Sequence, residues 1–132
     1  MNLSNTVSYA VGILLQVLKA GSKGPVTATR ISSGCKFPPR FLYRVLRRLV
    51  DAGLLTAVSG PGGGYTLAKK PSSITLFDIL HAVEGPCEAS RLTHVSPKHK
   101  RAIAAINAAS ERIVARVNRD LAKINLAQLG RA

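Results

Sequence analysis

The sequence is poor in cysteine and in long apolar runs, and each shortage excludes a class of protein. Its two cysteines, Cys35 and Cys87, are too few for a disulfide framework. No stretch approaches the roughly 18–20 consecutive apolar residues of a transmembrane helix, so we expect no membrane partner. The apolar segment 7–18 is interrupted by polar residues and follows no basic segment, which indicates an amphipathic helix and not a signal peptide. We expect a cytoplasmic protein.

Acidic residues are also scarce, and their distribution argues against an enzyme. The six Asp and Glu side chains are scattered without an evident general acid and base pair. There is no G-x-S-x-G elbow, and His81, His94 and His99 lack a metal-binding spacing. The glycine run 60–64 matches neither a P-loop nor a dinucleotide fingerprint, since it leads into a predicted strand. We predict no catalytic residue, no resident metal and no enzyme activity.

Positive charge, by contrast, is abundant. The chain has 19 Lys and Arg against 6 acids, a formal net charge of +13 over 132 residues. Residues 27–70 contain 8 basic residues and 1 acid, and residues 98–132 contain 8 and 2. Such a field favours a polyanionic partner, because each neutralised phosphate releases condensed counterions. Charge alone does not distinguish DNA from RNA or from an anionic membrane.

Residues 39–52 are predicted to form a basic amphipathic helix that faces DNA. The core-facing stripe, at helical spacing, consists of Leu42, Val45, Leu46, Leu49 and Val50. The opposite face consists of Arg40, Tyr43, Arg44, Arg47 and Arg48. This face has no acidic residue before Asp51, so we expect no internal ion pair to account for it. Arginine can pair bidentately with guanine at a base edge.

The surrounding elements predict a mainly α fold with a small β-hairpin wing, a winged helix-turn-helix. Helices are expected over 4–20 and 27–33, a turn over 34–37, strands over 54–58 and 65–68, and a fourth helix from a capping box at Thr75 to Gly85. Glycines at the wing tip allow close approach to DNA. The further expected DNA contacts are Thr27, Ser59, Gly60, Gly62, Gly63, Gly64 and Tyr65.

The C-terminal third is predicted to be a loop over 87–96 and one long helix over about 97–128. A helix of that length is roughly 45 Å long, more than a small domain can cover. Its apolar stripe therefore favours a homodimer. The expected dimer-interface residues are Ile103, Ile106, Ile113, Val117, Leu121 and Ile124. The predicted organisation is a DNA-binding domain over 1–86, the loop over 87–96 and a dimerisation helix over 97–132.

Several motifs resemble the IscR/NsrR-like (Rrf2) family of bacterial transcription regulators. They are Ala52-Gly53-Leu54-Leu55, the wing Gly60-Pro61-Gly62-Gly63-Gly64-Tyr65, Ile74-Thr75-Leu76 and Val83-Glu84-Gly85. The resemblance implies a homodimeric regulator of transcription that binds palindrome-like operators in double-stranded DNA. We predict a sequence-specific regulator that acts as a repressor. The same resemblance implies that the third helix enters the major groove, that the wing meets the minor groove and that the last helix is the dimer arm.

The resemblance also places a sensor in the loop over 87–96, where the possible sensor residue is Cys87. Cluster-binding members have three cysteines there, whereas this chain has one, so we expect no iron–sulfur cluster and no other cofactor. Two alternatives stay open. The first is a redox or metal sensor that uses Cys87, with His94, His99 or Glu88 as co-ligands. The second is a nonspecific architectural or RNA-binding protein.

Overall fold

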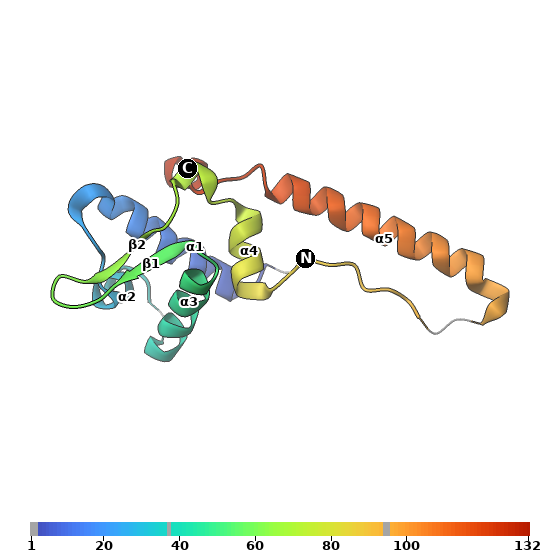
Figure 1. Cartoon of the computed structure of the whole chain (residues 1–132), viewed down its shortest axis with the longest axis horizontal. Coiled ribbons are helices and arrows are strands. Elements are labelled where there is room, and N and C mark those ends of the chain that lie inside the picture. Colours follow the sequence, from blue (N-terminus) through green and yellow to red (C-terminus); the bar gives the residue numbers. More distant parts are fainter. Residues whose placement is uncertain (1–2, 37, 94–95) are drawn as a thin grey trace.

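Helices and one hairpin form the head of the molecule around a single apolar core (Figure 1). The computed structural model describes residues 3–36, 38–93 and 96–132; Phe37 of the predicted turn and His94 of the proposed ligand set lie outside this range. The elements of the head are α1 (Asn5–Ala20), η1 (Gly21–Lys23), α2 (Ala28–Gly34), α3 (Pro39–Asp51), β1 (Leu55–Val58), β2 (Gly64–Leu67), η2 (Pro71–Ser73) and α4 (Leu76–Glu84). The predicted winged helix-turn-helix is confirmed.

Local sequence accounts for most of these elements. The stripe on α3 is fully apolar, and Leu42, Val45, Leu46 and Leu49 are all buried. Pro39 occupies the first turn of α3, where its missing N–H has no helical partner. The capping box of α4 is present: the Asp78 backbone N–H donates to Thr75 Oγ1 at 3.1 Å, and the Thr75 N–H donates to Asp78 Oδ2 at 3.0 Å.

The wing is an antiparallel pair of strands attached to the body of the head. Its register pairs Leu55 with Leu67 and Val58 with Gly64. A further bridge joins β2, close to the tip of the wing, to the chain before α2, since the N–H of each of Val26 and Tyr65 donates to the carbonyl of the other, at 3.0 and 2.9 Å. The wing is therefore fixed relative to α2 and α3.

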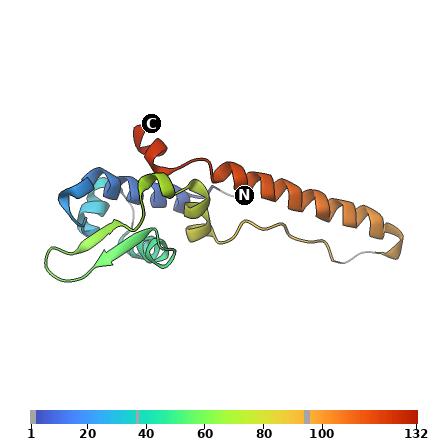
Figure 2. The same cartoon turned by 45° about the horizontal axis from the view of Figure 1, so that its top comes forward.

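Beyond α4 the chain leaves the head and returns to it, which forms the arm. Residues 85–93, here called the strap, run outward in extended conformation, and η3 (Pro97–His99) lies at the far tip. The helix α5 (Lys100–Leu121) runs back beside the strap, as both Figure 1 and Figure 2 show. The last helix, α6 (Leu126–Arg131), packs against α1 in the head.

The prediction of one helix over 97–128 is wrong at its C-terminal end. The helix α5 ends at Leu121, and Asn125 begins α6 with a capping box in which it exchanges hydrogen bonds with Gln128. The segment between them pairs with the head, because the Leu76 N–H donates to the Ile124 carbonyl and the Leu126 N–H to the Ile74 carbonyl, each at 2.8 Å. The segment 122–132 therefore belongs to the head and not to a dimerisation helix.

Polar side chains of α5 hold the strap in place. Asn107, which is 8% exposed, accepts from the Leu92 N–H at 2.9 Å and donates to the Leu92 carbonyl at 3.2 Å. Glu111 forms an ion pair with Arg91, and Asn118 donates to the Cys87 carbonyl at 3.2 Å. Because these groups replace the water that the extended backbone would otherwise bind, the strap and α5 form one unit.

Candidate nucleic-acid interface

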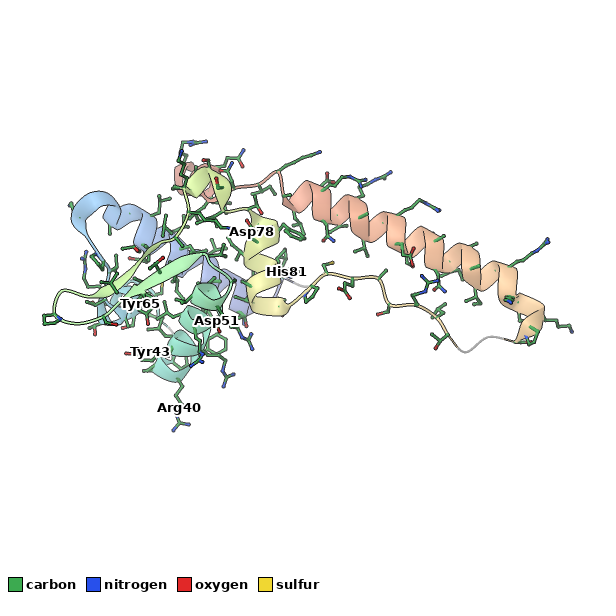
Figure 3. All side chains as sticks on the ribbon, in the orientation of Figure 1. Arg40, Tyr43, Asp51, Tyr65, Asp78 and His81 are labelled. Carbon is green, nitrogen blue, oxygen red and sulfur yellow. The ribbon has the colours of Figure 1, made fainter. Side chains whose placement is uncertain are left out.

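The outer face of α3 presents the side chains that the sequence assigns to DNA. Arg40, Tyr43 and Arg44 are exposed, Tyr43 by 58%. Figure 3 shows Arg40 extending from the N-terminal end of α3, beyond Tyr43. Among the described residues, none of the ion pairs involves Arg40 or Arg44. Two cations and a phenol are thus exposed on one face of α3, while the opposite face of the helix is buried in the core.

Two other arginines of α3 have partners within the chain, so the expectation of no internal pair is wrong. Arg47 Nε lies 3.8 Å from Asp51 Oδ2, one helical turn along, with both side chains well exposed at 84% and 69%. Arg48 Nη1 donates to the Val83 carbonyl at 2.7 Å, which ties α3 to the C-terminal end of α4. An exposed pair such as Arg47–Asp51 is weak and leaves Arg47 free to exchange partners. Arg48, however, is directed at the head itself.

The tip of the wing combines exposed turn residues with glycines that the fold requires. Ser59, Gly60 and Gly62 are exposed, and the two glycines have φ of +87° and +74°. A Cβ on Gly63 would lie 2.2 Å from the Val58 carbonyl oxygen, and one on Gly64 would lie 2.5 Å from that of Val26. The close packing of the hairpin is therefore sufficient to explain Gly63 and Gly64, and the exposed tip is the part that could meet DNA.

A groove separates α3 from the wing. It has a volume of about 400 Å³ and is lined by Tyr43, Arg47, Val50, Asp51, Ala57 and Tyr65. Tyr65 is half-buried, and its backbone forms the bridge to Val26. The structure thus brings Tyr65 of β2 to the same surface as Tyr43 and Arg47 of α3.

Thr27 follows Val26, the residue that is bridged to Tyr65 of the wing, and a basic cleft lies nearby. Thr27 is exposed, and its Oγ1 accepts from the Arg30 N–H at 3.2 Å, so it is the N-cap of α2. A cleft of about 350 Å³ between α1 and α2 is lined in part by Lys19, Lys23 and Arg30. Sequence reasoning does not find this cleft, because its cations come from three separate elements and form no local motif.

Cys87 lies at the start of the strap, in a small pocket between α4 and the end of α5. The pocket has a volume of about 240 Å³, and its lining includes Glu84, Glu88 and Leu121. Glu84 accepts a hydrogen bond from the Ser4 hydroxyl. Cys35 is elsewhere, against α1, since a Cβ on Gly12 would lie 3.3 Å from its Sγ.

These donors do not fit a cysteine-ligated iron–sulfur cluster. Such a site takes four thiolates, and the pocket offers one thiol and two carboxylates. Within residues 3–36, 38–93 and 96–132 no group of three or more His, Cys, Asp and Glu side chains could hold a metal ion. His99 lies at the distant tip, in η3.

The apolar residues of the arm are divided between two surroundings. Ile106 and Ile113 are 48% and 63% exposed, whereas Ile103 and Val117 are half-buried. Leu121 is 8% exposed and belongs to the core of the head, so its assignment to a dimer interface is corrected. Ile124 is 38% exposed, but its carbonyl is bonded to the head. The exposed apolar surface of α5 itself is therefore centred on Ile106 and Ile113.

None of the helices in the described ranges is both long and apolar enough to span a bilayer.

Comparison with known proteins agrees with this architecture. The model of the Rrf2 family, described as an iron-dependent transcriptional regulator, matches residues 3–132. The HTH-type transcriptional regulator IscR of Escherichia coli is 36% identical over 91 residues, which cover 69% of this chain and 56% of IscR. The chain thus spans little more than half the length of that relative.

Solved structures extend the similarity to the arm. CymR of Bacillus subtilis, titled the global cysteine regulator, is 25% identical with a TM-score of 0.75 and covers 98% of this chain and 96% of its own. IscR of T. potens has a TM-score of 0.67 at 23% identity, covering 98% of this chain and 85% of its own, and supports the fold alone.

Proposed function

The chain belongs to the Rrf2 family of transcriptional regulators, and on this premise we propose that it is a homodimeric, sequence-specific DNA-binding regulator that represses transcription. The observation that carries the proposal is the outer face of α3. It holds Arg40, Tyr43 and Arg44 in the open, next to a wing whose tip is exposed. A helix of this kind fits the major groove, with the wing at the adjacent minor groove.

The proposed contacts fall into two classes. Arg44 and Tyr43 lie in the middle of α3 and read base edges, while Arg40 at its N-terminal end and Arg47 bind phosphate. Ser59, Gly60 and Gly62 approach the minor groove through their backbone. Arg48 serves the head through its bond to the Val83 carbonyl. Lys69 and Lys70, exposed just past the wing, add phosphate contacts.

Substitution of Arg44 tests this reading. Arg44→Ala should weaken binding to the preferred site by about 1–3 kcal/mol more than binding to random duplex, because a base-edge contact carries sequence information. The matched control is Lys69→Ala/Lys70→Ala, which should flatten the salt dependence and leave the preference intact. Equal losses on both duplexes would assign Arg44 to phosphate. Wild-type binding that is uniform across sequences would favour the architectural alternative.

We infer that two copies pair through the apolar face of α5. Ile106 and Ile113 are seven residues apart, two turns along one side of the helix, and both are exposed in the single chain. Ile106→Ala/Ile113→Ala should shift the protein toward monomer in sedimentation, while Val58→Ala, which removes exposed apolar surface from the wing, should not. A dimer of unchanged stability in the double variant would contradict this pairing.

We propose that the signal does not pass through a cysteine-ligated cluster. One thiol per chain at Cys87 gives two per dimer, half of what an all-cysteine [2Fe–2S] site takes. Anaerobic reconstitution with iron and sulfide should leave the protein colourless and its DNA affinity unchanged. Stable visible absorbance that is lost in Cys87→Ala would overturn this proposal and favour the metal-sensing alternative.

We propose that repression results from occupancy of the DNA site. A dimer bound in the groove excludes other proteins from the same base pairs.

A further inference from the structure

The helix α5 has three distinct faces, and the structure covers only one of them. At about 100° per residue, Asn107, Glu111 and Asn118 share the face that binds the strap. Ile106 and Ile113 share the apolar face. Arg112, Arg116 and Arg119 share a third, here called the arginine face, about 130° from the strap face and about 100° from the apolar face.

The arginine face carries charge that its surroundings do not neutralise. All three arginines are exposed. The two acids of α5 are engaged elsewhere, Glu111 with Arg91 and Asp120 with Lys123 at 3.4 Å. Within the described ranges, no ion pair involves any of the three arginines. Three guanidinium groups thus lie along about 10 Å of one helix side without an ion pair among the described residues.

This face is turned away from the reading helix. Figures 1 and 2 both place the strap on the same side of α5 as α3. By helical spacing, the arginine face lies about 130° round the helix from the strap. A duplex held by α3 and the wing is therefore out of reach of the arginine face of the same protomer. Pairing of two arms through the apolar face would leave the arginine face open.

The residue types favour double-stranded nucleic acid over other polyanions. Guanidinium groups form bidentate hydrogen bonds with phosphate oxygens. On this side of the helix the positions one and two turns before Arg112 are small, Ala108 and Ala105, so a membrane-binding helix would find no apolar anchor there. The helix α5 contains no aromatic side chain, whereas proteins that bind single strands stack bases on aromatics. A helix side that consists of small residues and arginines fits the phosphate backbone of a duplex.

We propose that the arginine face binds the phosphate backbone of a second DNA duplex, so that a regulator seated on its site bridges to another segment of DNA. The inference rests on the proposed function, since the first duplex is held by α3 and the wing. Binding by the arginine face is independent of sequence, because it involves phosphates alone.

A bridging assay tests the proposal. An immobilised duplex with the selected preferred site is saturated with protein, and capture of a labelled random-sequence duplex is measured against salt. Arg112→Gln/Arg116→Gln/Arg119→Gln should reduce capture by about tenfold or more and lower the log–log salt slope by about 3 per protomer. Its affinity for the immobilised site should stay within about twofold. The matched control, Lys98→Gln/Lys100→Gln/Arg131→Gln, removes equal charge off the face and should capture normally.

The outcomes separate this inference from the proposed function. If the wild-type protein occupies its site but captures no second duplex, or if the triple arginine variant captures as well as the control, the bridging proposal is overturned and the proposed function stands. Binding to anionic phospholipid vesicles or to single-stranded RNA through the same arginines, without bridging, would also overturn it. If the wild-type protein prefers no site at all, the proposed function fails. Direct binding of a random duplex by Arg40→Ala/Arg44→Ala at low salt then tests the arginine face: retained binding supports it, and loss of binding overturns it.

Discussion

The two basic helices, α3 and α5, differ in how far their apolar residues are buried within the chain. The 13 residues of α3 bury four side chains in the core of the head, whereas the 22 residues of α5 bury only Asn107 and Leu121. The apolar face of α3 is thus satisfied within one chain, and its arginines are presented by a rigid support. The apolar face of α5 is not satisfied in this way, which is the basis of the proposed pairing of two arms. The order of the arm depends on side-chain bonds to the strap.

The difference between the buried head and the exposed arm can be tested where the two meet, at Leu126, which is fully buried. If 122–132 is part of the head, Leu126→Ala should lower the free energy of unfolding by about 2–5 kcal/mol, the usual effect of truncating a core leucine. Urea unfolding measures it. Ile113→Ala, at 63% exposure, serves as the control and should leave the unfolding of the monomeric head nearly unchanged. Equal effects would place Leu126 in the arm.

We expect that the strap can be destabilised by a substitution in α5 that leaves the stability of the head unchanged. Asn107→Ala removes both hydrogen bonds to Leu92 and should destabilise the strap by about 1–3 kcal/mol, since it leaves the Leu92 backbone without its partners. Hydrogen exchange should accelerate over 88–93 and stay unchanged in α3. Protection of the strap in the variant would show that other contacts hold it.

Substitutions at Thr27 separate its role as the N-cap of α2 from its proposed role as a DNA contact. Thr27→Ala removes the acceptor of the Arg30 N–H and should destabilise the head by about 0.5–2 kcal/mol. Thr27→Ser keeps the hydroxyl and should keep stability. Thermal unfolding and DNA affinity are measured together. A loss of affinity in the alanine variant with no loss of stability would make Thr27 a contact and not a cap.

The smallest effect is expected at the exposed pair on α3. Arg47→Ala should change the stability of the head by less than about 0.5 kcal/mol, because the pair with Asp51 is solvated. Affinity for DNA should fall, with a reduced dependence on salt. Asp51→Asn, which frees Arg47, should have the opposite effect on affinity. A marked loss of stability in Arg47→Ala would mean that the arginine supports the head.

The sequence predicts what local pattern controls and misses what tertiary contacts control. The stripe on α3, the wing and the capping box at Thr75 are each fixed by neighbours a few residues apart. The end of α5 is not marked by glycine or proline, and the box at Asn125 and Gln128 lies inside an apparently continuous apolar repeat. The bond from Arg48 to the Val83 carbonyl spans 35 positions. On a helical wheel, Asn107 and Asn118 are indistinguishable from solvent-facing residues.

Selection of bound sequences from a pool of random duplexes tests the central claim, that α3 and the wing read DNA as a dimer. The wild-type protein should enrich an inverted repeat whose half-sites lie about 34–36 Å apart, centre to centre. Arg44→Ala should lose the preference at one position of each half-site and keep the rest. Binding without any enriched sequence, or enrichment of the same repeat by Arg44→Ala at undiminished strength, would contradict the account.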